Sequence, residues 1–84
     1  MTTEDRIRTF VLDELNFDGD PSELTPDFPL IDRHVVDSLG IMQMVTFLEE
    51  ELGVAVADDD VVPEHFESVR RIAELVEARR GARR

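Results

Sequence analysis

The sequence predicts an all-α fold, a four-helix bundle of three main helices and one short helix. Apolar residues recur at three- and four-residue spacings in three separate stretches, which is the pattern of amphipathic helices. No stretch alternates between apolar and polar residues for long enough to form a pair of β-strands. Eighty-four residues leave no room for a second core, so residues 1–84 are expected to form a single domain.

The first helix is expected to begin at Thr2 or Thr3, either of which can cap it, and to end before the turn-forming run NFDGD. Its apolar stripe consists of Ile7, Phe10, Val11 and Leu15. A long connection with three prolines follows, from about Phe17 to Asp37. A connection this long in a small domain usually either has a function or is held against the rest of the structure. The apolar residues of this connection favour packing over the helices.

The second helix is expected to run from about Asp37 to Leu52, with Gly53 as the residue that ends it. At about 100° per residue, Leu39 falls on the side opposite the core face and therefore points outwards beside Ser38. A lone exposed leucine is ordinary, but the adjacent serine and the flanking Met42 favour a small patch that faces a partner. The core face of this helix is expected to consist of Ile41, Met44, Val45, Leu48 and Leu52.

The C-terminal part is expected to contain a short helix and a longer one. Residues 58–60 can cap the short helix, which tolerates Pro63 only within its first turn. Ser68 is the expected N-cap of the last helix, from Val69 to about Arg80. Residues 80–84 are expected to form a disordered basic tail.

The formal net charge is −11, and residues 1–68 carry 18 acidic side chains against three arginines. Such a surface repels nucleic acids and anionic membranes and favours basic protein surfaces, and its self-repulsion is expected to weaken the fold at low salt. The chain has no cysteine, which excludes disulfides and thiolate chemistry. Neither a signal peptide nor a long apolar run is evident, so a cytoplasmic protein is expected.

Ser38 stands where the long connection gives way to the second helix. A hydroxyl there is exposed near the positive end of the helix dipole, which favours a phosphate ester. His34 and His65 are the only histidines, and the sequence has no GxSxG elbow, Walker A loop, GxGxxG or HExxH motif. Ser38 is therefore predicted to be a residue to which another enzyme attaches a cofactor, with no catalytic residue or metal ligand in the chain.

Two alternatives from other functional classes remain open at this point. An acidic helical adaptor would bind a basic partner through the second helix and use the serine hydroxyl only as a cap. A degenerate calcium module would use Asn16, Asp18 and Asp20, which alternate as in an EF-hand loop. Against it, Pro21 replaces the glycine of the sharp turn and Asp27 replaces the bidentate glutamate.

The segments LIDRHVVDSLGIMQMVTFLEEELGVAV and DDDVVPEHFESVRRIAELV together resemble acyl and peptidyl carrier proteins. These are the phosphopantetheine-bearing modules of fatty-acid, polyketide and nonribosomal-peptide synthesis, and the resemblance covers nearly the whole chain. It implies a free-standing carrier without catalysis of its own. Ser38 would receive 4′-phosphopantetheine from coenzyme A through a separate phosphopantetheinyl transferase, and the thiol of that arm would carry an acyl or aminoacyl thioester.

The resemblance also implies which residues partner enzymes recognise: Asp37, Leu39, Met42, Glu49 and Glu50. The implied partners of the monomeric carrier are the transferase, an adenylate-forming ligase or acyltransferase, and ketosynthase or condensation enzymes.

Two departures from the family pattern carry expectations of their own. Many relatives have glycine shortly before the DSL motif, where this chain has His34, so a positive φ there would be borne at some cost. Gln43 and Thr46 replace the more acidic residues common in fatty-acid carriers. Together with the DVVPEHF turn, they favour specialised biosynthesis over bulk fatty-acid synthesis.

Overall fold

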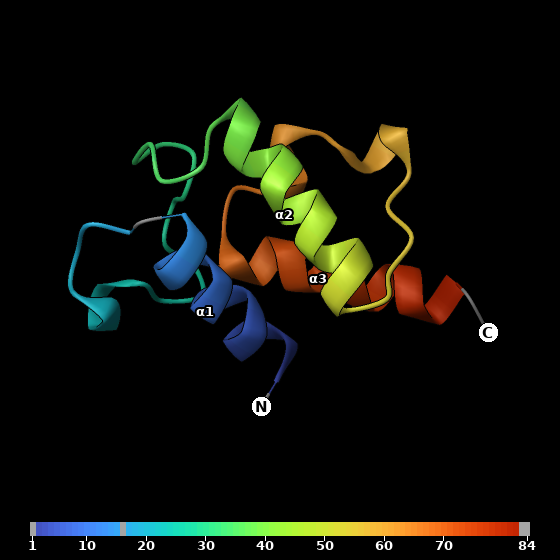
Figure 1. Cartoon of the computed structure of the whole chain (residues 1–84), viewed down its shortest axis with the longest axis horizontal. Coiled ribbons are helices and arrows are strands. Elements are labelled where there is room, and N and C mark those ends of the chain that lie inside the picture. Colours follow the sequence, from blue (N-terminus) through green and yellow to red (C-terminus); the bar gives the residue numbers. More distant parts are fainter. Residues whose placement is uncertain (1, 16, 83–84) are drawn as a thin grey trace.

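Three α-helices in the structure correspond to the three main helices expected from the sequence (Figure 1). The computed structural model describes residues 2–15 and 17–82. Helix α1 spans Thr3–Glu14, α2 spans Ser38–Glu51 and α3 spans Val69–Ala82. The described residues contain no β-strand, so the all-α prediction is confirmed. None of the described helices is long and apolar enough to cross a membrane.

The short helix expected after residue 58 is replaced by two 3₁₀ turns, which corrects the four-helix description. These turns are η2 (Asp58–Asp60) and η3 (Pro63–His65), and a third, η1 (Pro21–Glu23), lies in the long connection. Val62, between η2 and η3, is extended with φ −129° and ψ 149°. A residue that precedes proline is pushed out of the helical region by the proline ring, so Pro63 prevents the two turns from joining into one α-helix.

Side-chain caps fix the starts of α1 and α3. Thr2 Oγ1 accepts a hydrogen bond from the Asp5 amide at 3.1 Å, and the Asp5 carboxylate accepts one from the Thr2 amide at 3.1 Å. These bonds lower the pKa of Asp5. Ser68 Oγ accepts from the Arg71 amide at 3.1 Å, which confirms Ser68 as the residue that starts the last helix.

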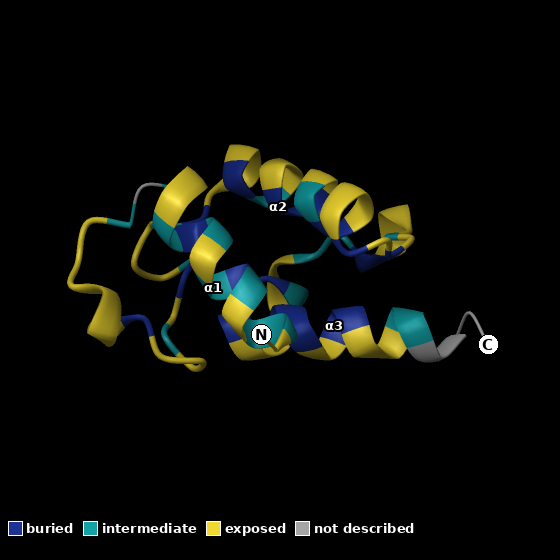
Figure 2. Cartoon of the chain, turned by 60° about the horizontal axis from the view of Figure 1, so that its bottom comes forward, coloured by how far each residue is buried: buried dark blue, intermediate teal, exposed yellow. Residues whose placement is uncertain are grey.

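The core lies where the three helices and the long connection meet, and their buried faces turn towards one another (Figure 2). Ile41 is an exception to the expected core face of α2, because it is only half-buried. Helix α1 packs most closely on α3. The buried apolar residues are Ile7, Val11, Leu24, Leu30, Val36, Met44, Val45, Leu48, Leu52, Val54, Phe66, Val69, Ile72, Ala73, Leu75 and Val76.

The long connection before α2 is anchored along its length, as its apolar residues predicted. Its side chains Leu24, Leu30 and Val36 are buried in the core. Its backbone is bonded to the start of α3, since the Leu30 amide donates to Glu67 O at 2.8 Å and the Arg70 amide donates to Pro26 O at 2.9 Å. These bonds fix the route by which the backbone reaches the start of α2.

Helix α3 continues to Ala82, beyond its expected end at about Arg80. Arg80 Nη1 donates to Thr3 Oγ1 at 3.3 Å and to Glu77 Oε2 at 3.2 Å, which ties this end of α3 to the start of α1. Residues 80–82, the first part of the expected basic tail, therefore belong to α3. Residues 83–84 lie outside the described part of the chain.

Candidate functional site

Ser38 is the first residue of α2, and its side chain is exposed. The N-cap is Asp37, whose Oδ1 accepts a hydrogen bond from the Gly40 amide at 2.8 Å. The serine therefore does not cap the helix, and this corrects the role that the adaptor alternative gave it. Its hydroxyl remains available at the positive end of the helix.

A short turn before α2 determines the direction in which Ser38 is presented. His34 has a φ of 61°, so this position does take the positive φ that glycine adopts more readily than histidine. Its amide donates to Ile31 O at 3.0 Å, and the amides of Val35 and Val36 both donate to Leu30 O. The buried Val36 then anchors the turn in the core two residues before the serine.

Two apolar side chains lie exposed close to Ser38 on α2. Leu39 is 67% exposed and Met42 is 56% exposed, and they are the large hydrophobic residues exposed in the described part of the chain. Leu39 thus points outwards as predicted, and Met42 is more exposed than its expected flanking position suggested. Glu49 and Glu50 are exposed further along the helix, and Glu49 Oε2 accepts from the Val56 amide at 3.4 Å.

The described residues do not assemble a catalytic or metal-binding arrangement around Ser38. No hydrogen bond joins its hydroxyl to a histidine of the described chain, so no base is placed to activate it. No group of three His, Cys, Asp or Glu side chains within the described ranges is placed to hold a metal ion.

Of the residues of the calcium alternative, Asp20 has another structural role and Asp18 is exposed. Asn16 lies outside the described residues. Asp20 caps η1 by accepting hydrogen bonds from the Ser22 amide and hydroxyl, both at 2.9 Å, and these bonds lower its pKa.

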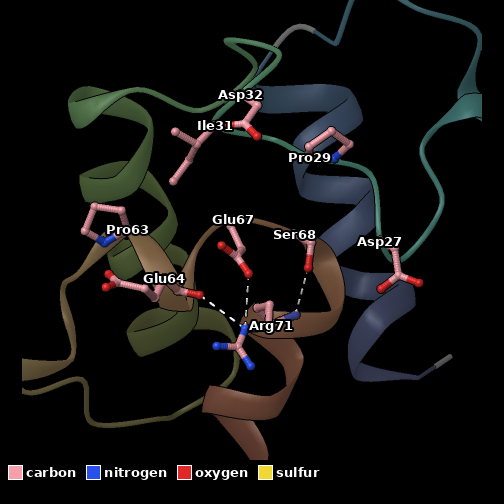
Figure 3. Close-up of a pocket in the computed structure, with 9 residues that line it drawn as sticks. All are labelled: Asp27, Pro29, Ile31, Asp32, Pro63, Glu64, Glu67, Ser68 and Arg71. Atoms are coloured by element: carbon pink, nitrogen blue, oxygen red, sulfur yellow. Dashed lines mark hydrogen bonds and ion pairs between the residues drawn. The ribbon is translucent and has the colours of Figure 1, made fainter.

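A cleft of about 450 Å³ lies between the long connection, η3 and the start of α3 (Figure 3). Four carboxylates line it, and Arg71 donates to Glu64 O at 3.3 Å and pairs with Glu67 at 3.5 Å. Ser38 is not among its lining residues. An excess of carboxylates opposes a phosphodiester, so the cleft does not suit the charged end of a phosphate-linked cofactor. The carboxylates belong to Asp27, Asp32, Glu64 and Glu67.

Comparison with known proteins identifies the family. The family model described as phosphopantetheine attachment site matches residues 5–76. An acyl carrier protein of Solidesulfovibrio magneticus is 26% identical over 81 residues, covering 96% of this chain and 99% of the relative. An acyl carrier protein of Nitratidesulfovibrio vulgaris is 28% identical over 60 residues, covering 71% of this chain and 76% of the relative.

A solved structure shows the same fold. It is described as the crystal structure of an FAD-dependent dehydrogenase, and one of its chains superimposes with a TM-score of 0.72 at 27% sequence identity. The match covers 83% of this chain and 97% of that chain.

The cofactor of this family is 4′-phosphopantetheine, and the start of α2 fits a group attached through a phosphate ester. It offers an exposed hydroxyl, a helix N-terminus and a first turn whose cap is supplied by a different residue, Asp37. The arm supplies the thiol that the cysteine-free chain lacks. The chain therefore belongs to the phosphopantetheine attachment site family and is a carrier protein rather than an enzyme.

Proposed function

We propose that Ser38 is the residue that bears 4′-phosphopantetheine in a free-standing carrier of acyl or aminoacyl thioesters. The observation that carries this proposal is the division of roles at the start of α2, where Asp37 caps the helix and the serine hydroxyl stays exposed and unbonded to described residues. Ser38 also lies within the DSLG motif and within the residues that match the family.

The exposed side of α2 is the proposed recognition surface for the enzymes that load and use the carrier. Leu39 and Met42 supply apolar contact area beside Ser38, and an enzyme that covers them removes exposed hydrophobic surface from water. Asp37, Glu49 and Glu50 supply negative charge for basic enzyme surfaces.

The proposed partners are a phosphopantetheinyl transferase, an adenylate-forming ligase or acyltransferase, and ketosynthase or condensation enzymes. Because the solved relative is described as an FAD-dependent dehydrogenase, an enzyme of that kind joins the partners to be tested. The exposed Gln43 and Thr46 reduce the acidity of the α2 surface, which supports polyketide, nonribosomal-peptide or related specialised biosynthesis.

Intact-mass measurement tests the attachment site. Incubation with coenzyme A and a broad-specificity phosphopantetheinyl transferase should add about 340 Da to the chain. Ser38→Ala should abolish the addition, whereas Ser22→Ala, which removes another exposed serine, should leave it intact. A wild-type chain left unmodified by several transferases, or a modified Ser38→Ala chain, would refute the proposal.

Transferase kinetics test the recognition surface. Leu39→Gln and Met42→Gln should each lower kcat/KM for modification by roughly fivefold, the effect of losing about 1 kcal/mol of interface contact. Thr9→Gln on the exposed part of α1 is the control and should have no effect. Equal kcat/KM values for all three variants would show that the transferase does not contact this side of α2.

A further inference from the structure

Arg33 is the one arginine of the described chain whose side chain has neither a hydrogen bond nor an ion pair with a described residue. All the arginines of α3 pair with acidic side chains. Arg6 and Arg8 donate to backbone oxygen atoms. Arg33 is exposed, and its guanidinium carbon lies 5.6 Å from the centre of the Phe28 ring. A cation–π contact at an exposed site is weak, so this positive charge is available to another group.

The free guanidinium belongs to the turn that leads to Ser38. The serine follows Arg33 by five residues, a distance of at most about 17 Å even for an extended backbone. The amides of Val35 and Val36 both donate to Leu30 O, so the backbone turns within this segment and the distance is shorter. A flexible arginine side chain on this turn can therefore swing from its aromatic neighbour towards a group on the serine.

A phosphodiester on Ser38 would add negative charge to a surface that is already acidic. The neighbouring Asp37 carries a carboxylate, and the chain as a whole has a formal net charge of −11. The N-terminus of α2 supplies only a partial positive charge, and the Asp37 carboxylate already accepts a bond from it through the Gly40 amide. The attached phosphate therefore needs a further counter-charge, and Arg33 is the unpaired cation that the preceding turn offers.

We propose that Arg33 pairs with the phosphodiester formed at Ser38 and thereby positions the first part of the attached arm. This inference rests on the proposed attachment of 4′-phosphopantetheine to Ser38. A guanidinium presents several N–H groups to phosphate oxygens, and such charge-assisted hydrogen bonds are stronger than neutral ones. Attraction between exposed charges extends over about 8 Å at physiological ionic strength, which favours rotation of the Arg33 side chain away from Phe28. Arg33 is then a positioning residue that restricts the direction in which the arm leaves α2.

Thermal unfolding of the chain before and after modification with coenzyme A and a phosphopantetheinyl transferase tests the pairing. Modification should lower the melting temperature of Arg33→Gln by about 3 °C more than that of the wild type, because the added charge has lost its partner. Arg33→Lys keeps the positive charge and should respond to modification within about 1 °C of the wild type. Arg70→Gln, which removes another exposed arginine, is the matched control and should respond as the wild type does. The difference at Arg33→Gln should disappear in about 1 M sodium chloride, which screens exposed charges.

NMR of the arginine side chains provides a second measurement that a purely structural role of Arg33 would not affect. The Nε–H signal of Arg33 should shift when the wild type is modified, whereas that of Arg70 should not. Intact mass separates the two proposals. A wild-type chain that gains no mass would overturn both the attachment and the pairing. A chain that gains the mass, but whose Arg33 signal stays unchanged or whose Arg33→Gln variant responds as the wild type does, would overturn the pairing alone.

Discussion

Asp37 and Ser38 are neighbours with different roles at the start of α2. The Asp37 carboxylate satisfies the amide of Gly40, and the serine hydroxyl is left exposed. Capping residues satisfy backbone donors that have no partner inside the helix, so the stability of the helix start depends on the aspartate. A substitution at the serine can therefore remove the proposed chemistry without removing the cap.

Substitution of these two residues should give different stabilities. Asp37→Ala should lower the free energy of unfolding by about 1 kcal/mol because the cap is lost. Asp37→Asn should retain most of that stability, because asparagine also caps helices. Ser38→Ala should change stability by less than about 0.5 kcal/mol. Urea denaturation followed by circular dichroism measures all three, and a loss at Ser38→Ala as large as that at Asp37→Ala would contradict this assignment.

His34 adopts the left-handed conformation that glycine tolerates best, with a φ of 61°. A non-glycine residue bears a cost of about 1 kcal/mol there, and a β-branched residue bears more.

His34→Val should therefore destabilise the fold by about 1 kcal/mol, whereas His34→Gly should be neutral or stabilising by up to about 1 kcal/mol. The same urea denaturation measures both variants. His34→Asn is the control, since asparagine tolerates this conformation, and it should match the wild type within about 0.5 kcal/mol. A valine variant as stable as the glycine variant would show that the turn relaxes to another conformation.

At the scale of elements, one ion pair ties the connection between α2 and α3 to the last turns of α3. Asp60 in η2 is 4% exposed and accepts a hydrogen bond from Arg79 Nη2, and its other oxygen accepts from the Ala57 amide at 3.1 Å. The bond from Arg79 lowers the pKa of Asp60 and outweighs the opposing effect of burial. The expected short helix is thus replaced by 3₁₀ turns that are fastened to a distant part of the chain.

The lowered pKa of Asp60 predicts how the stabilisation of the fold by its ion pair with Arg79 depends on pH. The folded state favours the ionised carboxylate, so the stabilisation is complete above the unfolded pKa near 3.9 and is lost as the pH falls below it. Asp60→Asn should lower the free energy of unfolding by about 1–2 kcal/mol at pH 7. This loss is smaller than that for a fully buried ion pair because the Arg79 side chain is partly exposed to water.

Urea denaturation at a series of pH values measures the difference between wild type and Asp60→Asn. This difference should be constant from pH 7 to about 5 and should shrink below about pH 4. Asp59→Asn, an exposed neighbour, is the control and should show no comparable loss at pH 7. A difference that is unchanged at pH 3 would show that Asp60 stabilises the fold by packing rather than by charge.

At the scale of the whole molecule, the arginines are placed unevenly relative to the acidic residues. Every ion pair of the described chain uses one of four arginines of α3: Arg70, Arg71, Arg79 or Arg80. The acidic side chains of α1 and α2 are left without such partners in the described part. The resulting repulsion opposes folding most strongly at low ionic strength.

The melting temperature should therefore rise with added sodium chloride or magnesium chloride at pH 7. A gain of about 1 kcal/mol corresponds to a rise of roughly 5 °C for a domain of this size. Glu50→Gln combined with Glu51→Gln removes two unpaired charges of α2 and should reduce the rise. A melting temperature that is independent of salt would show that repulsion is not a significant term in the stability of this fold.

The sequence by itself determined the three main helices, the outward Leu39 and the serine proposed to carry the cofactor. Helical periodicity and helix-start signals are local, and they depend on residues only a few positions apart. The family resemblance also singled out His34 as a position where a positive φ would carry a cost, and the structure supplied the conformation itself.

Only the tertiary structure decided the features that join distant parts of the chain. The pairing of Asp60 with Arg79, the hydrogen bond from Arg80 to Thr3 and the stacking of Phe10 on Phe47 each require two segments far apart in sequence to meet. The structure also decided that Asp37, and not Ser38, caps α2. The two possibilities differ by one residue in where the helix begins, and helical periodicity does not locate a helix start that accurately. Local patterns therefore predicted the helices and the proposed attachment serine, whereas packing between helices produced the stacked pair of Phe10 and Phe47 and the anchored connections.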